Sequence, residues 1–471
     1  MRRPLAPDLC VIGAGSAGLS VAAGSAQMGA EVVLIERGLM GGDCLNFGCV
    51  PSKSLLAAAR LADATRRGVA FGISFTPPQI DFAAVIESVH EVIAAVAPND
   101  SAERFERLGV RVLRAEARFT SPRTVLAGDL EIRARRFVIA TGSQPAVPTI
   151  PGLDRIRYLT NETIFANHEL PEHLIVIGGG PIGIEMAQAH RRLGAEVTVL
   201  DIGPLLPGDD PELVASLLTR LTGEGIVARS GIEITRIERD SNTITVHLAD
   251  GGEITGSHLL VAAGRRPSIE ALDLPAAGIQ ATARGIEVDS RLRTTNRRAF
   301  AIGDVAGGPQ FTHIANYHAG IVIRNALFRL PAKVDYRALP WVTYTDPELA
   351  QVGPTEASAR AGGEKVRVLR WSFVENDRAQ TERDTEGLVK VVLGRSGRVL
   401  GASILGVGAG DLILPWALAI SQKLKIGALA NLIVPYPTRG EASKRAAACY
   451  YTPTLFSPRT RSLVRLLARF G

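Results

Sequence analysis

The sequence predicts an α/β protein in which one strand–loop–helix–strand unit occurs twice. Each copy begins with a short apolar run, continues through a glycine-rich loop and a helix-forming stretch, and ends at an acid after a second apolar run. The first copy has its loop at residues 13–18 and its acid at Glu36, and the second has them at residues 178–183 and Asp201. The second loop follows the first at the same distance in sequence as the second acid follows the first acid. This constant spacing indicates an internal repeat.

The glycines of both loops suit a bound nucleotide. In such a loop the first glycine makes a tight turn, the second lets a pyrophosphate approach the backbone, and the third lets helix and strand pack closely. The helix N-terminus faces the phosphates, and the acid accepts hydrogen bonds from a ribose. The residues concerned are Gly13, Gly15, Gly18 and Glu36 in the first copy, and Gly178, Gly180, Gly183 and Asp201 in the second. The sequence therefore predicts two bound nucleotides.

Length and composition exclude several classes of protein. A chain of 471 residues has room for about three domains. Apolar residues make up 46% and charged residues 21%, which excludes a disordered or collagen-like chain. A net charge of +6 does not indicate a nucleic-acid partner. No run of about 18 uncharged apolar residues occurs, so we expect no transmembrane helix, and because we recognise no export signal we expect a cytoplasmic location.

Two cysteines, Cys44 and Cys49, follow the first unit at the start of an Ala/Leu-rich stretch. A disulfide between them requires a distorted first helical turn, which Gly48 permits. A helix N-terminus lowers the pKa of a thiol and favours the thiolate needed for redox chemistry. No second cysteine pair or histidine cluster accompanies them in the sequence. We therefore interpret the pair as redox-active rather than as half of a metal site, and we expect no metal site.

The string GGDCLNFGCVPSK at residues 41–53 resembles the redox-active motif of the class I pyridine nucleotide–disulfide oxidoreductases. That family includes dihydrolipoamide dehydrogenase, glutathione reductase and mercuric reductase. Further segments that resemble family motifs follow in the family's order and extend the resemblance over almost the whole chain. They lie at residues 140–142, 264–267, 301–304 and 341–353.

The resemblance implies two Rossmann-like domains, for FAD and NAD, and an α+β C-terminal dimerisation domain. The FAD domain would cover residues 1–150 and 275–340, the NAD domain residues 151–274, and the dimerisation domain residues 341–471. The first glycine loop and Glu36 would then hold FAD, and the second loop and Asp201 the nicotinamide cofactor. Further cofactor-binding residues implied by the family are Gly42, Lys53, Ala115, Thr141, Gly142, Gly264, Gly303 and Asp304.

The family also implies roles in electron transfer. Cys49 resembles the thiol that faces the flavin, and Cys44 the interchange thiol that meets the substrate. Lys53 and Glu185 match the family's ion pair near the flavin and nicotinamide rings, although Glu185 could instead be an acid on a helix surface. Cys10 lies in an apolar run and is interpreted as a buried core residue.

The sequence departs from dihydrolipoamide dehydrogenase near its C-terminus. The family's His-Pro-Thr segment, with a Glu three residues after the Thr, is matched by Pro437, Thr438 and Glu441, but Tyr436 occupies the histidine position. That histidine acts as acid and base from the partner subunit, and a tyrosine is almost never a base at neutral pH. Tyr436 could donate a proton, contact a ligand or pack at a dimer interface. His313 and His318 are weaker candidates for the missing base.

Mercuric reductase also has a tyrosine in this region, but it carries an adjacent cysteine pair near its C-terminus. Here Cys449 is single, and we interpret it as a structural thiol. Three hypotheses remain. The first is an NADH-dependent reductase of a small disulfide, a metal–thiol adduct or another soft electrophile. The second is a dihydrolipoamide dehydrogenase that has replaced its histidine, and the third is a flavin redox sensor or partner-binding subunit without turnover.

Charged residues indicate the preferred coenzyme, and the family resemblance indicates the partner. Asp201 would repel a 2′-phosphate and residues 202–206 contain no arginine, so we expect NADH rather than NADPH. The family resemblance implies a homodimer acting on a small-molecule substrate. The tail at residues 457–471 combines apolar residues with several arginines. We expect it to pack on its own dimer, and contact with an anionic membrane surface is the alternative.

Overall fold

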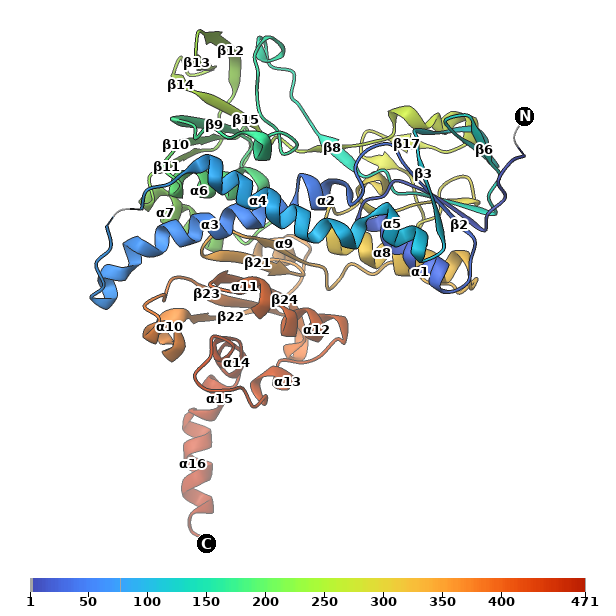
Figure 1. Cartoon of the computed structure of the whole chain (residues 1–471). Helices are drawn as coiled ribbons and strands as arrows, with labels where there is room; N and C mark the ends of the chain where they lie inside the picture. Colours follow the sequence, from blue (N-terminus) through green and yellow to red (C-terminus); the bar gives the residue numbers. More distant parts are fainter. Residues whose placement is uncertain (1–2, 77, 471) are drawn as a thin grey trace.

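The computed structural model describes residues 3–76 and 78–470, so the outermost residues of the expected FAD and dimerisation domains lie outside the described part. Two parallel sheets form the upper part of the molecule, and an antiparallel sheet with its helices lies below them (Figure 1). Within the described residues, no helix is both long enough and apolar enough to cross a membrane.

The first parallel sheet carries the first glycine loop. Its strand order is β19-β7-β1-β2-β3, and every neighbouring pair is parallel. The strands are β1 (Leu9–Ile12), β2 (Val32–Glu36), β3 (Val110–Arg114), β7 (Arg136–Ile139) and β19 (Ala299–Ala301). Helices α1 (Ser16–Gln27) and α8 (Thr312–Ala326) pack against each other beside this sheet. Strand β1 is buried over its whole length, as expected for a parallel sheet with both faces covered.

The second parallel sheet repeats this arrangement with the second loop. Its order is β11-β10-β9-β15. The strands are β9 (His173–Ile177), β10 (Glu196–Leu200), β11 (Ile226–Arg229) and β15 (His258–Val261), with helices α6 (Pro181–Arg192) and α7 (Pro211–Gly223). An antiparallel sheet of β12 (Ile234–Asp240), β13 (Thr243–Leu248) and β14 (Glu253–Gly256) adjoins it. The β9–α6–β10 unit therefore matches β1–α1–β2 in structure as well as in sequence.

The C-terminal sheet is antiparallel, with the order β20-β21-β24-β23-β22. Its strands are β20 (Pro340–Thr343), β21 (Glu348–Val352), β22 (Arg367–Ser372), β23 (Leu388–Leu393) and β24 (Val399–Gly406). Helices α12 (Leu414–Ser421) and α14 (Glu441–Ala448) bury Trp416 and Ala446 in the core beside it. This sheet with its helices, together with the two parallel sheets, confirms the expected α/β fold with an α+β C-terminal domain.

The last helix, α16 (Pro458–Leu467), extends away from the body at the C-terminal end (Figure 1). None of its residues is buried, and Leu463 and Leu467 are each more than half exposed. Within one chain, the described residues of helix α16 therefore have no packed face.

Shorter elements connect these parts. They are α4 (Phe82–Val96), α5 (Ala102–Arg107), β4 (Ala117–Ser121), β5 (Thr124–Ala127), β6 (Leu130–Ile132), β8 (Ser143–Pro145), β16 (Arg265–Pro267), β17 (Ala281–Thr282), β18 (Gly285–Ile286), α9 (Glu356–Ala361), α10 (Asp377–Thr381), α11 (Ala409–Leu412), α13 (Gly427–Ala430) and α15 (Thr452–Leu455).

The cysteine segment forms two helices rather than one. Cys44 lies in the short helix α2 (Gly42–Asn46), and Cys49 begins the long helix α3 (Cys49–Arg67). Gly48 separates the two helices, and a Cβ at this position would lie 3.0 Å from both the carbonyl and the carboxylate of Asp43. The distortion expected at Gly48 is thus present, as a break between two helices, and Asp43 is the neighbour that a side chain there would crowd.

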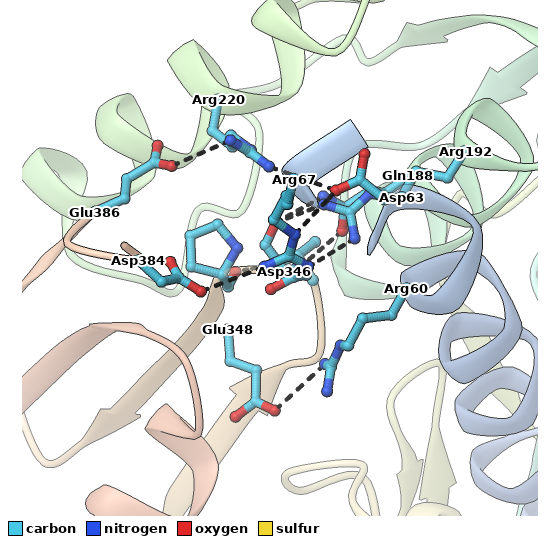
Figure 2. A network of polar contacts seen from close by, with 12 residues as sticks. Arg60, Asp63, Arg67, Gln188, Arg192, Arg220, Asp346, Glu348, Asp384 and Glu386 are labelled. Atoms are coloured by element: carbon cyan, nitrogen blue, oxygen red, sulfur yellow. Dashed lines mark hydrogen bonds and ion pairs between the residues drawn. The ribbon is translucent and has the colours of Figure 1, made fainter. Parts of the chain in front are cut away.

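A buried ion network joins the far end of α3 to the other two parts of the molecule (Figure 2). The Arg192 side chain is 2% exposed and lies 2.7 Å from Glu224 and 2.8 Å from Asp346. Its guanidinium is also 3.6 Å from Asp63 on α3. Asp346 belongs to the loop before β21, so a single arginine contacts acids from all three parts.

Helix α3 contributes its own cation to this network. Arg67 lies 2.7 Å from Asp346 and 3.3 Å from Asp384. Gln188 of α6 donates a hydrogen bond to the Asp346 carbonyl and accepts one from the Asp346 amide. The network therefore fixes α3 against α6 and against the C-terminal domain at the same point.

We predict that Arg192→Leu lowers the free energy of unfolding by about 3–5 kcal/mol, because it removes a buried cation that contacts Glu224, Asp346 and Asp63. Arg37→Leu is the matched control, since the Arg37–Glu116 pair is exposed and such pairs contribute about 0–1 kcal/mol. Denaturant unfolding of both variants measures the difference. Equal, small effects of the two substitutions would contradict a structural role for the network.

Candidate functional site

A cavity of about 1930 Å³ lies where the two glycine loops and the cysteine pair meet. This volume is well beyond the roughly 300–1,000 Å³ of a site for one drug-sized ligand. Most of the residues predicted from the sequence line it. They are Gly13, Gly15, Glu36, Gly42, Cys44, Cys49, Lys53, Ala115, Thr141, Gly142, Gly178, Gly180, Glu185, Asp201, Gly264, Gly303 and Asp304.

The first loop has the backbone geometry expected from its glycines. Gly13 has a φ of +104°, which favours glycine, and a Cβ there would clash with the Ala140 carbonyl. Gly15 borders the cavity, and the nearest atom to a Cβ placed on it is 3.9 Å away. Gly18 lies behind the loop, where a Cβ would overlap the Gly13 carbonyl. The three glycines thus make the turn, leave the backbone open and allow close packing.

The second loop repeats each of these features. Gly178 has a φ of +116°, a Cβ on Gly180 would meet nothing within 4 Å, and a Cβ on Gly183 would overlap the Gly178 carbonyl. The acids also match: Glu36 accepts a hydrogen bond of 2.6 Å from the Ala14 amide, and Asp201 one of 2.6 Å from the Gly179 amide. Each acid therefore lies directly beside its loop.

These loops fit the phosphates of a dinucleotide. Helices α1 and α6 both have glycine as N-cap, so no side chain of the cap residue occupies their first amides. Free amides at a helix N-terminus, together with the helix dipole, bind anions. Gly15 and Gly180 leave the space that a pyrophosphate needs. The residues present thus fit FAD at the first loop and a nicotinamide dinucleotide at the second.

The cysteine pair is reduced in this structure, and both thiols are free. Cys49 Sγ lies 3.3 Å from the Thr312 hydroxyl at the start of α8. The hydrogen bond from Cys44, with help from Thr312 and the positive charge of Lys53, lowers the pKa of Cys49 to about 6. The same bond to Cys49, together with burial, raises the pKa of Cys44 far above its usual range. At neutral pH the pair therefore consists of a Cys49 thiolate that accepts a hydrogen bond from the Cys44 thiol.

An ion pair lies one helical turn from Cys49. Lys53 Nζ is 2.8 Å from Glu185 Oε2, and it also lies over the Tyr344 ring, 4.3 Å from the centroid. The other oxygen of Glu185 accepts the Tyr344 amide at 2.9 Å. Glu185 is 4% exposed, so the alternative interpretation as a helix-surface acid is wrong. This pair joins α3 to α6 at the cavity.

Several residues of the site were not identified from the sequence. Asp43 lies 3.2 Å from the Arg265 guanidinium and accepts a hydrogen bond of 3.0 Å from Asn161. Arg265 also donates to the Ser143 hydroxyl, which in turn donates to Asp304. Burial raises the pKa of Asp304. Asp43, Arg265 and Tyr344 lie within segments that resemble family motifs, but their contacts join parts far apart in the chain and could not be read from those motifs.

The C-terminal residues are not part of this cavity within one chain. The Tyr436 side chain is 69% exposed, and its hydroxyl donates a 2.9 Å hydrogen bond to Asp377. Neither Tyr436 nor Glu441 borders the cavity in the part of the chain that is described. A role for them at the cysteine pair requires a second subunit.

The two histidines considered as substitutes have other partners. His318 is buried, accepts the Gly303 amide at 3.1 Å and lies 2.6 Å from the Tyr336 hydroxyl. His313 borders the cavity, but its Nε2 lies 2.8 Å from the Pro340 carbonyl, and burial lowers its pKa. Because a carbonyl only accepts, Nε2 must be protonated to bond it. Neither histidine contacts either sulfur through a hydrogen bond in the described structure.

The remaining cysteines lie elsewhere. Cys10 is fully buried in β1, where burial raises its pKa, in agreement with a core residue. Cys449 follows α14 and is half-buried beside the core of the C-terminal domain.

Comparison with known proteins agrees with this geometry. Residues 7–319 match the family model described as pyridine nucleotide-disulphide oxidoreductase, and residues 339–447 match the dimerisation domain of the same family. The mercuric reductase of Streptomyces lividans is 37% identical over 94% of this chain and 96% of its own. The dihydrolipoyl dehydrogenase of Geobacillus stearothermophilus is 35% identical over 93% of this chain and 95% of its own.

Among solved structures, the HOCl-induced flavoprotein disulfide reductase RclA from Escherichia coli superimposes with a TM-score of 0.84 at 29% identity. The match covers 94% of this chain and 99% of that chain. The chain therefore belongs to the pyridine nucleotide-disulphide oxidoreductase family and is a flavoprotein disulfide reductase with a C-terminal dimerisation domain.

Proposed function

We propose that this enzyme passes electrons from NADH through FAD to the Cys44–Cys49 pair, and from there to a small disulfide, a metal–thiol adduct or another soft electrophile. In this it would be mercuric-reductase-like. The observation that carries the proposal is the combination of a thiolate–thiol pair at the cavity with Tyr436 in place of a histidine. The proposed domain limits are those expected from the sequence, and the predicted site residues keep the roles that the resemblance implies.

Bound FAD would supply two-electron transfer between NADH and the cysteine pair. The protein's own contribution is to hold Cys49 as a thiolate, by the hydrogen bond from Cys44, the contact with Thr312 and the charge of Lys53. Lys53 is itself held by Glu185 at 2.8 Å. Cys44, which borders the same cavity, is the thiol left to meet a substrate.

Reduction of a disulfide needs no base other than this pair. Cys44 transfers its proton to Cys49, attacks one sulfur of the substrate disulfide and releases the other sulfur as a thiolate. The proton now on Cys49 passes to that leaving thiolate. The Cys49 thiolate then attacks Cys44, which breaks the mixed disulfide and restores the Cys44–Cys49 bond. Two electrons leave the pair, and the substrate leaves as two thiols once the second has taken a proton from water.

Reduction of a metal–thiol adduct requires even less proton transfer than reduction of a disulfide, because both cysteines bind a soft metal ion as thiolates. Oxidation of a dithiol, by contrast, requires a base that removes protons from the substrate. The hydrogen bond to Asp377 raises the pKa of Tyr436, so its hydroxyl stays protonated at neutral pH. The dihydrolipoamide dehydrogenase alternative therefore has no evident base, and the intact pair with Lys53 and Glu185 favours turnover over a pure sensor or binding role.

We propose NADH as the preferred coenzyme. Asp201 and Glu233 border the cavity near the second loop, and both carboxylates would repel a 2′-phosphate. Arg266, which also borders the cavity, is paired with Glu270 at 2.6 Å. A higher kcat/KM with NADPH than with NADH would contradict this assignment.

We further propose a cytoplasmic homodimer. The dimerisation domain exposes apolar side chains on α12 and on the loop after α13, with Leu414 69% and Ile433 99% exposed. A second subunit would cover such residues and would bring Tyr436 and Glu441 to its partner's cavity. The tail helix α16 would then pack on the dimer, with membrane contact as the alternative. A cytoplasmic location agrees with a dithiol that must be kept reduced.

We predict fast NADH oxidation with thiol-buffered Hg(II) or a small disulfide, and slow reduction of NAD⁺ by the dithiol dihydrolipoamide. General-base catalysis supplies roughly 100- to 10,000-fold, so Tyr436→His should raise the dihydrolipoamide rate. Cys44→Ala is the control that should abolish turnover with every acceptor. Rapid, Cys44-dependent oxidation of dihydrolipoamide by the unaltered enzyme would overturn the proposal in favour of dihydrolipoamide dehydrogenase.

We also predict a pH dependence of the reduced pair. Since the pKa of Cys49 is lowered to about 6, its thiolate should be lost as the pH falls through that value. Cys44→Ala removes the hydrogen-bond donor and should move the midpoint upward toward the ordinary thiol range. Ultraviolet thiolate absorbance, read against Cys49→Ala as blank, measures both midpoints. An unchanged midpoint in Cys44→Ala would show that Cys44 does not stabilise the thiolate.

A further inference from the structure

Three side chains outside the cavity bring metal-ligand atoms together. Glu87 and His90 project from α4, and His168 follows the short helical turn Ile164–Ala166. One ligand atom from each residue lies within 4.8 Å of those from the other two. The sequence separates His168 from α4 by more than seventy positions, so the cluster becomes visible only in the fold.

The spacing is close to that of a bound transition metal. His168 Nδ1 lies 3.7 Å from Glu87 Oε1. In a tetrahedral site with bonds of about 2.0–2.1 Å, ligand atoms are separated by roughly 3.4 Å. The rings of His90 and His168 are 6.0 Å apart and meet edge to face at 69°. Small side-chain rotations would therefore place all three ligand atoms around one ion.

The backbone holds one ring nitrogen of His90 and leaves the other free. Its Nε2 lies 2.9 Å from the Phe165 carbonyl oxygen, so this nitrogen donates a proton and Nδ1 carries the lone pair. Metal-ligating histidines are usually held in this way, with the other ring nitrogen bonded to a carbonyl or carboxylate. Ile86 and Val89, on the neighbouring side of α4, are buried, which anchors the helix that carries two of the ligands.

We propose that Glu87, His90 and His168 bind one divalent transition-metal ion of the zinc type, with water completing its coordination. Two neutral imidazoles and one carboxylate form a donor set that suits Zn²⁺ and excludes hard ions such as Mg²⁺. The ion would fasten α4 to the segment at residues 164–168. Ile164 and Phe165 of that segment border the cavity, so the metal would stabilise one of its walls. This site is independent of the proposed electron transfer.

The test uses the FAD-loaded enzyme, oxidised so that Cys44 and Cys49 form a disulfide and cannot compete for metal. A Cys449→Ser background removes the other accessible thiol. Calorimetric titration with ZnCl₂ should show one Zn²⁺ per chain. His90→Ala and His168→Ala should each weaken binding by at least about tenfold, the low end of the cost of losing even an outer-shell partner. His168 is exposed, so its replacement leaves the fold intact.

His247→Ala is the matched control. His247 also lies beside two acids, Glu238 and Glu253, but the Arg236 guanidinium 3.3 Å from its Nε2 opposes a cation. This variant should bind Zn²⁺ like the parent. As a second readout, Zn²⁺ should raise the Tm of the parent and leave that of His168→Ala unchanged. Absence of Zn²⁺ binding by the parent, or full binding by both histidine variants, would overturn the proposal.

Discussion

The attachment of helix α3 at both of its ends determines where the chemistry of this protein takes place. At the first end, Lys53 pairs with the buried Glu185 of α6, one turn from Cys49. At the far end, Arg67 reaches Asp346 of the C-terminal domain, and Asp63 lies beside the buried Arg192 (Figure 2). A rigid helix held at two points keeps Cys49 at a fixed position in the cavity. The ion network is thus structural, yet the geometry of the cysteine pair depends on it.

The two nucleotide loops share one backbone conformation. Gly13 and Gly178 adopt the same positive φ, and Gly18 and Gly183 approach the carbonyl of the first glycine in the same way. Glu36 and Asp201 each accept the amide of the residue after that glycine. The two loops open into one cavity that also contains the cysteine pair. In the proposed electron transfer the path would be short, because the repeat and α3 bring the two loops and the cysteine pair to one cavity.

Much of this could be predicted from the sequence, because the loops and the cysteine pair depend on local residue patterns. The repeated glycine pattern predicted both loops, and the family resemblance implied the fold class with its C-terminal domain. Gly48 predicted a distorted first helical turn, which the structure shows as a break between α2 and α3. The burial of Glu185, the contact of Thr312 with Cys49 and the Asp43–Arg265 pair could not be predicted. Each joins segments more than a hundred residues apart, so only tertiary packing reveals them. The same holds for Arg192, whose sequence neighbours give no sign of burial. Tyr436 lies away from the cavity, and its expected role depends on a second subunit.

The central claim is that electrons from NADH reach the Cys44–Cys49 pair. The most direct measurement is trapping of thiols by alkylation and mass spectrometry, on the FAD-loaded enzyme denatured before and after anaerobic addition of NADH. We expect Cys10 and Cys449 to be alkylated in both samples, and Cys44 and Cys49 only after NADH. If Cys44 and Cys49 are labelled equally with and without NADH, or remain unlabelled in both samples, the pair does not receive these electrons and the account is wrong.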